Sequence, residues 1–188
     1  MRQENESTSH HGEESCQKSG KLFGKISLIT ETDSGIGRPV AIAFAREDAD
    51  IAIAYYTEDK DSETTVEWAQ KTGRRAIRFP RSYRLQSHYN EIIKRTVDEF
   101  GQPDILVNNA ACQKSVTEFS EINEEEPDTT FRTNFNGTFF LCQAALPHLN
   151  NGASVINISS INAVQPSSYL PAYAAAKATI FNFTACPA

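Results

Sequence analysis

Residues 26–37 read Ile26-Ser27-Leu28-Ile29-Thr30-Glu31-Thr32-Asp33-Ser34-Gly35-Ile36-Gly37. The first five form a short apolar run, which predicts a buried strand, and the stretch from Val40 to Arg46 has apolar residues on one face, which predicts a helix. Glycines between a strand and a helix let the backbone approach a pyrophosphate, and the helix N-terminus offers free N–H groups and positive potential. Glycine-rich turns also occur simply to close a tight corner, so this turn alone does not establish a nucleotide site.

The rest of the chain repeats this alternation of short β-rich runs and longer helical stretches. We predict strands at 26–30, 51–55, 75–79, 104–108 and 154–158, and helices at 40–46, 62–71, 87–100 and 127–149, with a last helix from about Pro171. This order predicts an α/β fold, a doubly wound parallel sheet of the Rossmann type in three α/β/α layers. Ligands of such sheets bind beyond the carboxyl ends of the strands.

Composition limits the classes of function. The 188 residues suit one domain, but residues 1–20 hold almost no large apolar groups, so we predict a flexible arm over 1–20 and a folded domain over 21–188. The formal net charge of −6 argues against a nucleic-acid partner and against an anionic membrane surface. No apolar run is long enough to span a bilayer, and the start lacks the apolar core of a secretory signal, so we expect a cytoplasmic protein.

The cysteines and histidines do not indicate a metal site. The four cysteines lie far apart and include no Cys-x-x-Cys pair, which argues against a disulfide framework and against a zinc knuckle. Two of the four histidines fall in the predicted arm, and the other two stand alone. We therefore expect no bound metal.

Two further motifs fall at the ends of predicted strands. Asn108-Asn109-Ala110-Ala111 ends the fourth strand, where asparagine side chains can bridge strand ends and small alanines leave room for a ligand. Ser160 follows the fifth strand. Tyr173 and Lys177 lie four residues apart on the last predicted helix, so they share one face of it.

The pairing of Tyr173 with Lys177 suits proton transfer. A phenol with an ordinary pKa of about 10 is a poor acid–base group at neutral pH, and a neighbouring ammonium lowers that pKa. The hydroxyl of Ser160 can hold the oxygen of a carbonyl or alcohol. Tyr-x-x-x-Lys pairs often occur by chance on exposed helices, but here three motifs follow in order along one βα framework. Tyr169 has no lysine four residues later, so Tyr173 is the candidate.

Together these motifs make the chain resemble a short-chain dehydrogenase/reductase of the extended-N-terminus bacterial type, similar to glucose-dehydrogenase-like members. The segments His11-Gly12-Glu13-Glu14-Ser15 and Ser19-Gly20-Lys21-Leu22 resemble the arm that precedes the first strand in that subgroup. The resemblance covers nearly the whole chain. It implies an oxidoreductase that uses NAD or NADP to transfer a hydride to or from an alcohol or carbonyl substrate.

The resemblance also implies roles for individual residues. Tyr173 would exchange the proton, Lys177 would lower the pKa of the phenol and hold the nicotinamide ribose, and Ser160 would orient the substrate oxygen. Asn134, on the long helix, would support a water-mediated proton relay through the lysine. The expected cofactor contacts are Asp33, Ser34, Gly35, Ile36, Gly37, Tyr55, Asn108, Ala110, Tyr173 and Lys177.

Four positions depart from the family pattern. Glu31 stands where the family has glycine, so we expect a non-glycine residue at positive φ, at a cost of about 1–2 kcal/mol, with its carboxylate facing the pyrophosphate. Asp48 replaces a helix-ending glycine at a smaller cost. Ser82 replaces an aspartate that contacts adenine, and Tyr55 stands where an NAD-preferring member has an acidic residue. The choice between NAD and NADP therefore stays open.

Family members continue beyond the Tyr/Lys helix with further strands and a substrate-covering segment, whereas this chain ends at Ala188. We therefore expect an incomplete Rossmann domain that lacks the last strands and leaves an exposed edge on the fifth strand. The alternatives to an enzyme are a non-catalytic, truncated Rossmann module that binds nucleotide or a protein partner, and an inactive fragment. The resemblance also implies a homo-oligomer formed through the long helix and the Tyr/Lys helix.

Overall fold

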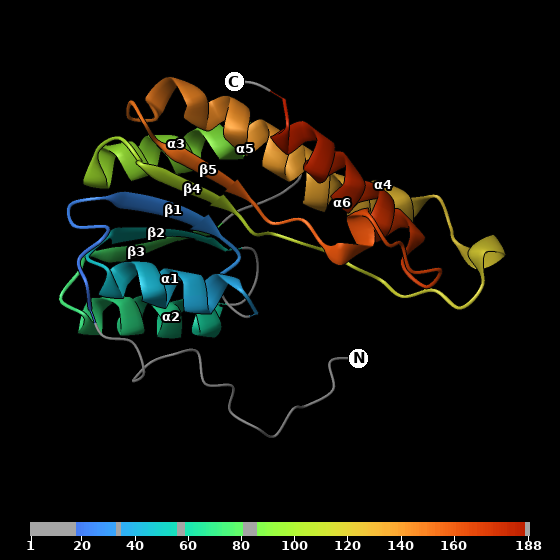
Figure 1. Ribbon diagram of the computed structural model, residues 1–188, viewed down its shortest axis with the longest axis horizontal. Coiled ribbons are helices and arrows are strands. Elements are labelled where there is room, and N and C mark those ends of the chain that lie inside the picture. The colour runs from blue at the N-terminus through green and yellow to red at the C-terminus, as the bar shows by residue number, and fades with distance from the viewer. Residues whose placement is uncertain (1–17, 33–34, 56–58, 81–85, 187–188) are drawn as a thin grey trace.

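The computed structural model describes residues 18–32, 35–55, 59–80 and 86–186. Within them lies a sheet of five strands in the order β3-β2-β1-β4-β5, and every neighbouring pair is parallel (Figure 1). The strands are β1 (Ile26–Thr30), β2 (Asp50–Tyr55), β3 (Ala76–Pro80), β4 (Ile105–Asn108) and β5 (Ser154–Asn157). The predicted doubly wound parallel sheet is confirmed.

Helices cover both faces of this sheet. α1 (Gly37–Arg46) and α2 (Asp59–Lys71) lie on one face, and α3 (Gln86–Phe100) and α5 (Gly137–Ala145) lie on the other (Figure 1). α4 (Glu125–Phe131) and α6 (Pro171–Thr184) pack together and extend past the carboxyl ends of the strands. The other described elements are three short 3₁₀ turns, η1 (Phe119–Glu121), η3 (Leu146–His148) and η4 (Ile161–Ala163), and a π-helical turn, η2 (Arg132–Asn136).

The central strand β1 divides its side chains between two hydrophobic clusters, because successive residues of a strand point to opposite faces. Leu28 packs with residues of α3 and α5 such as Ile93 and Leu141. Ile29 packs with Ala41 and Ala45 of α1 on the other face. Both faces of β1 are therefore buried, which explains why its sequence is a nearly continuous apolar run rather than an alternating one.

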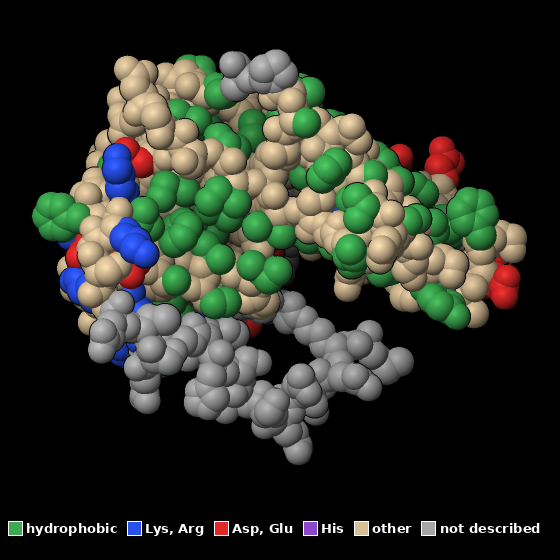
Figure 2. Space-filling model, viewed as in Figure 1, with side chains coloured by type: hydrophobic (Ala, Val, Ile, Leu, Met, Phe, Trp, Pro, Cys, Tyr) green, Lys and Arg blue, Asp and Glu red, His purple; other side chains and the backbone are tan. Residues whose placement is uncertain are grey.

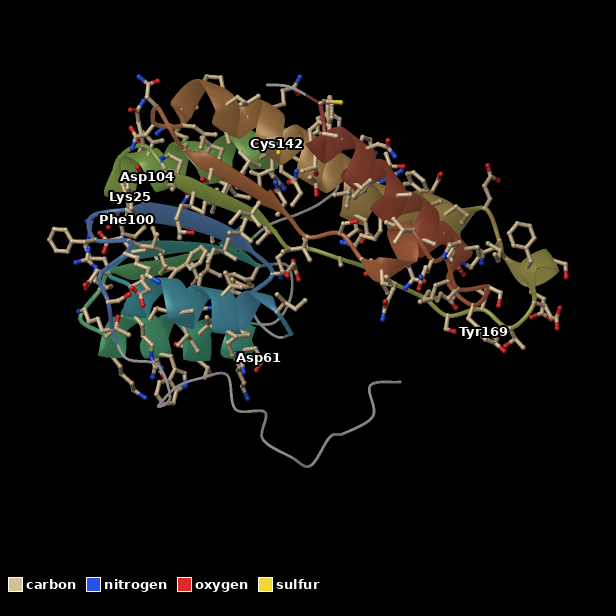
Figure 3. All side chains as sticks on the ribbon, in the orientation of Figure 1. Lys25, Asp61, Phe100, Asp104, Cys142 and Tyr169 are labelled. Carbon is tan, nitrogen blue, oxygen red and sulfur yellow. The ribbon has the colours of Figure 1, made fainter. Side chains whose placement is uncertain are left out.

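A buried carboxylate aligns the amino ends of β1 and β4. Asp104 accepts hydrogen bonds from Lys25 Nζ at 2.9 Å, from the Ile26 N–H at 3.0 Å and from Asn150 Nδ2 at 3.2 Å. Figure 3 labels Lys25 and Asp104 together at this end of the sheet. Burial acts to raise the pKa of Asp104, but these hydrogen bonds outweigh it and hold the pKa below its usual value.

The helix predicted over 127–149 is longer at its start and interrupted in the middle. Its helical path begins at Glu125, two residues before Pro127, which is tolerated in the first turn because the N–H it lacks has no intrahelical partner there. A π-helical turn, η2 (Arg132–Asn136), joins α4 to α5. Pro147 cannot donate to the preceding turn, and the helix ends in the 3₁₀ turn η3. Apolar periodicity carries no signal for the π turn.

β5 is an exposed edge of the described sheet. Val155 and Ile156 are 36% and 39% exposed, although they are apolar residues in a parallel strand. Phe181 of α6 is also exposed, and hydrophobic side chains gather on the viewed face over β5 and α6 (Figure 2). The exposed edge predicted for the fifth strand is confirmed.

Residues 1–17 of the predicted arm lie outside the described residues, and residues 18–21 contact the corner between α1 and β2. Lys18 Nζ pairs with Asp48 at 2.7 Å. The Ser19 hydroxyl and the Lys21 N–H both donate to Glu47 Oε2, at 2.6 and 3.0 Å. These contacts anchor residues 18–21 at the end of the sheet that carries Asp104.

Candidate active site

The N-terminus of α1 lies directly against the end of β1. A Cβ atom at Gly37, the first residue of α1, would lie 2.2 Å from the Glu31 carbonyl oxygen and 2.7 Å from Asn109 Nδ2. Only glycine fits so close an approach. Gly35 has φ 60°, which closes the turn, and Ile36 follows it with an exposed side chain. The first N–H groups of α1 therefore face the carboxyl edge of the sheet.

Two acidic residues hold the left-handed backbone expected of them. Glu31 has φ 54° and Asp48 has φ 77°, so both of these predictions are confirmed. The Glu31 N–H donates to the Ala54 carbonyl of β2 at 2.8 Å, and its own carbonyl accepts from Asn109 Nδ2 at 2.7 Å. These contacts hold the Glu31 backbone in place between β2 and β4.

Thr30 and Asn109 join the carboxyl ends of β1 and β4. The Thr30 hydroxyl oxygen accepts the N–H groups of Asn109 and Ala110, each at 2.9 Å, and donates to the Val107 carbonyl at 3.4 Å. Asn109 Nδ2 also donates to the Thr30 carbonyl at 3.0 Å. Ala110 is buried, and its backbone N–H is one of the groups that form this junction. Sequence reasoning named the asparagine motif but missed Thr30.

Asn108 faces the opposite way from Asn109. Its Nδ2 donates to Asn157 Oδ1 of β5 at 2.8 Å and to Cys142 Sγ of α5 at 3.2 Å. Asn157 Nδ2 in turn donates to Thr184 Oγ1 of α6 at 3.0 Å. The amide of Asn108 thus links β4, β5 and α5, whereas its Oδ1 is buried and finds no hydrogen-bond partner among the described residues.

Lys177 is the buried cation of this edge. It is 1% exposed, and its Nζ donates to the Ile158 carbonyl, directly after β5, at 2.6 Å. The same Nζ lies 5.7 Å from the centre of the Tyr173 ring, so the two side chains share one face of α6 as predicted. Burial lowers the pKa of Lys177 from 10.5 to about 8, because desolvation disfavours the charged amine.

The two serines after β5 have different partners. The Ser159 hydroxyl donates to the Lys177 carbonyl at 2.9 Å, which ties the loop to α6. The Ser160 hydroxyl oxygen accepts the Asn162 N–H at 3.2 Å and so caps η4, which packs against α6. Ser160 therefore stands at the start of a turn beside the helix of Tyr173 and Lys177. Sequence reasoning missed the anchoring role of Ser159.

Asn134 lies in the π turn and is fully buried. Its Nδ2 donates to the carbonyls of Cys112 and Thr130, each at 2.8 Å, and its own carbonyl accepts the Thr138 hydroxyl at 2.9 Å. Its Oδ1 has no hydrogen-bond partner among the described residues. A buried unpartnered oxygen is costly, and π turns often occur at functional sites, so both features mark this position.

A family model described as short chain dehydrogenase matches residues 25–188. The chain belongs to the short-chain dehydrogenase family. The Gly-rich turn, the asparagine turn after β4 and the Ser160, Tyr173 and Lys177 set all fall inside the matched range. This short-chain dehydrogenase fold also has solved relatives: a doubly substituted Serratia marcescens short-chain dehydrogenase/reductase superposes with a TM-score of 0.83 at 26% identity, over 87% of this chain and 66% of that one.

Curated proteins similar to this chain come from bacteria and plants. The uncharacterized oxidoreductase YhdF of Bacillus subtilis is 42% identical over 92% of this chain and 60% of its own length. The chloroplastic NADPH-dependent aldehyde reductase 1 of Arabidopsis thaliana is 38% identical over 95% and 64%. The glucose and ribitol dehydrogenase of Daucus carota is 37% identical over 93% and 62%. The chain spans about 60% of the length of the curated relatives it matches.

The end of β2 carries a cation–aromatic pair. Tyr55 is buried, its hydroxyl accepts from Arg78 at 3.4 Å, and the Arg78 guanidinium lies 5.5 Å from its ring centre. Asp33, Ser34 and Ser82, which sequence reasoning also singled out, lie outside the described residues.

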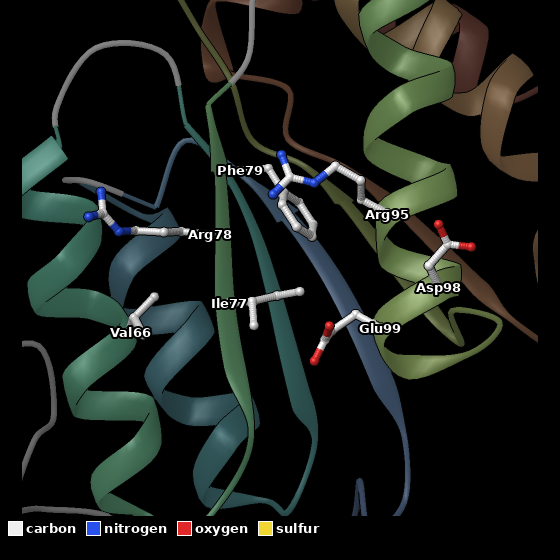
Figure 4. Close-up of a pocket in the computed structure, with 7 residues that line it drawn as sticks. All are labelled: Val66, Ile77, Arg78, Phe79, Arg95, Asp98 and Glu99. Carbon is white, nitrogen blue, oxygen red and sulfur yellow. The ribbon is translucent and has the colours of Figure 1, made fainter.

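A separate hollow of about 530 Å³ lies beside β3, between α2 and α3 (Figure 4). It is lined by Val66, Ile77, Arg78, Phe79, Arg95, Asp98 and Glu99. Arg78, one of its lining residues, is also the partner of Tyr55. In the parts of the chain that the structure describes, no group of three or more His, Cys, Asp or Glu side chains is placed to hold a metal ion, and no helix is long and apolar enough to cross a membrane.

Proposed function

We propose that this chain is the nucleotide-binding and catalytic part of an oxidoreductase that uses NAD or NADP to interconvert an alcohol and a carbonyl compound. The observation that carries the proposal is the Tyr173–Lys177 pair, with a buried lysine beside a phenol on α6, next to the turn that presents Ser160. This arrangement lies at the carboxyl edge of a parallel sheet, where such folds bind their ligands.

Tyr173 exchanges the proton. The ammonium of Lys177 stabilises the phenolate and lowers the barrier to proton transfer at neutral pH. Because the pKa of Lys177 is about 8, the amine keeps most of its proton near pH 7 while remaining able to release it. The Ile158 carbonyl holds the amine in position through the hydrogen bond of 2.6 Å.

Ser160 orients the substrate oxygen, and Asn134 supports proton movement. The Asn162 N–H fixes the position of the Ser160 hydroxyl oxygen, so its proton can be directed at a carbonyl. The unpartnered Oδ1 of Asn134 offers an acceptor to a bound water within the π turn. Such a water would link the lysine to solvent, and each turnover requires that link because the phenol must regain or release its proton.

The residues at the edge fit a dinucleotide. Gly37 brings the N-terminus of α1 against the end of β1, and the buried Thr32 Oγ1 has no hydrogen-bond partner among the described residues. Free N–H groups with positive potential suit a pyrophosphate. When bound, the nicotinamide ring of the cofactor supplies the group that accepts or donates the hydride. The negative charge of Glu31 opposes the binding of a pyrophosphate here, because like charges repel.

The names of two relatives support the substrate class. One relative is an NADPH-dependent aldehyde reductase and another is a glucose and ribitol dehydrogenase. We therefore propose aldehydes and polyols as the first substrates to test and NADPH as the first cofactor. The family resemblance supports a further proposal, a homo-oligomer formed through the long helix (α4 to α5) and α6.

A second candidate is a non-catalytic module that binds nucleotide or a protein partner, and an inactive fragment is the third. The exposed edge of β5, with Val155 and Ile156, favours these readings because an unpaired apolar edge associates readily. Co-expression with a complete relative tests the partner version, which fails if the two chains do not co-purify. Insolubility of the isolated chain favours the fragment.

The first test is a thermal melt of the purified chain with and without NADH and NADPH. A cofactor at about a hundred times its dissociation constant stabilises a folded binder by about 2.7 kcal/mol, so the melting temperature should rise with one of them. A cooperative melt that shifts justifies a screen of aldehydes and polyols. A melt that no dinucleotide shifts overturns the proposed oxidoreductase.

A further inference from the structure

The position of Glu31 is fixed from four directions. Its N–H donates to Ala54 of β2, its carbonyl accepts from Asn109 after β4, and that carbonyl lies against Gly37 of α1. The next residue, Thr32, is buried, and its carbonyl accepts the Thr65 hydroxyl of α2 at 2.8 Å. Because neighbours on β2, α1, α2 and the β4 turn all hold this backbone, Glu31 cannot relax its φ of 54° without breaking these contacts.

The same contacts hold the backbone of an acidic residue, Glu31, beside a helix end that can bind an anion. α1 begins at Gly37, in contact with the Glu31 backbone, and the side chain of Glu31 is only half-buried. An acidic side chain near a helix N-terminus interacts favourably with the same N–H groups and positive potential that a phosphate uses. The buried Thr32 Oγ1, which has no hydrogen-bond partner among the described residues, is a second sign that this corner accepts a polar ligand.

We propose that Glu31 limits the dinucleotide affinity of this chain, because its carboxylate competes with the pyrophosphate of the cofactor for the N-terminus of α1. The inference rests on the proposed function. It adds to that function a residue that sets cofactor affinity through its charge near the pyrophosphate, and not through contacts with the nicotinamide or the substrate. Removing the charge tightens binding, and raising the salt concentration, which screens like charges, reduces the difference.

The test compares dissociation constants for NADPH and NADH, measured by cofactor fluorescence on the purified chain without any turnover. Glu31→Gln removes the charge and keeps a non-glycine side chain on the left-handed backbone. Glu31→Gly removes the charge and the side chain together. Asp48→Asn is the matched control, because Asp48 is also an acidic residue at positive φ but lies at the other end of α1. Far-UV circular dichroism and a thermal melt establish that each variant is folded.

We expect Glu31→Gln to bind NADPH at least tenfold more tightly than the wild type in low salt, and Glu31→Gly to do the same or better. The gain should shrink in about 0.5 M salt, and Asp48→Asn should stay within twofold of the wild type. Unchanged or weaker binding by Glu31→Gln overturns the inference, as does a gain confined to Glu31→Gly, which would assign the effect to backbone strain. If the wild type and the Glu31 variants bind the dinucleotide with equal, measurable affinity, this inference is wrong and the proposed function stands. If no variant binds a dinucleotide, the proposed function is wrong as well.

Discussion

The Lys177 amine on α6 donates a 2.6 Å hydrogen bond to the carbonyl oxygen of Ile158, the residue directly after β5. The Ser159 hydroxyl returns a 2.9 Å hydrogen bond to the Lys177 carbonyl. This reciprocal pair joins α6 to the end of the sheet and holds the amine beside Tyr173. Two hydrogen bonds therefore tie the helix and its candidate catalytic lysine to the loop after β5.

Replacing Lys177 by methionine should change how stability depends on pH. Burial lowers the pKa of Lys177 to about 8, so between pH 8 and pH 10.5 the unfolded chain binds a proton that the folded chain has released. The wild type therefore gains stability relative to Lys177→Met as pH rises through this window, by up to about 3 kcal/mol. Urea unfolding at pH 7.5 and pH 10.5 measures the change. A difference that stays constant with pH would mean that the lysine is not desolvated.

Replacing Tyr173 by phenylalanine should greatly reduce turnover and leave cofactor binding intact. The ring is kept and only the hydroxyl that exchanges the proton is lost, so we expect kcat to fall about 10²–10⁴-fold. The matched control is Tyr169→Phe, because Tyr169 is 59% exposed and lies four residues earlier. Steady-state rates and NADPH titrations separate the two effects. Equal rates in the Tyr173 variant and the wild type would exclude the proposed proton donor.

Replacing Gly37 by alanine should destabilise the fold by about 2–3 kcal/mol, because the added Cβ would lie 2.2 Å from a backbone oxygen that is itself held in place. Gly152→Ala is the comparison: it has φ 79° with open space around the added atom, so it should cost only about 1 kcal/mol of left-handed strain. Urea midpoints measure both. If the two variants lose equal stability, the helix does not press against Glu31 as described.

Replacing Asp104 by asparagine should lower the free energy of unfolding, because Asp104 joins the amino ends of β1 and β4. Hydrogen bonds from Lys25, Ile26 and Asn150 hold the pKa of Asp104 below its usual value despite burial, so the wild type is stabilised above pH 3.8 and loses that advantage as pH falls through the lowered pKa. We expect a loss of about 1–2 kcal/mol at pH 7 that narrows toward pH 3.

The control for this variant is Asp98→Asn on α3. Asp98 pairs with Lys94 on an exposed helix surface and should contribute little. Chemical unfolding at pH 7, 5 and 3.5 gives the comparison. A pH-independent loss in the Asp104 variant would show that its charge is not involved.

Sequence alone was enough for the features that local patterns control. The run Ile26–Thr30 matched β1 residue for residue, because a strand buried on both faces needs a continuous apolar stretch. The left-handed backbone at Glu31 and Asp48 followed from the family resemblance, because the family has glycine at both positions. The shared face of Tyr173 and Lys177 followed from the helical period.

Only the tertiary structure decided which partners these residues meet. Sequence reasoning could not tell that Asn109 joins β1 while Asn108 joins β5, because that depends on the strand order β3-β2-β1-β4-β5. The partner of Lys177 is a backbone carbonyl nineteen positions earlier, and any residue type supplies such a group. The π turn at Asn134 likewise left no mark on the apolar pattern. Periodicity reports the burial of one face, whereas hydrogen-bond partners depend on how distant segments pack, and that is settled only when the whole sheet forms.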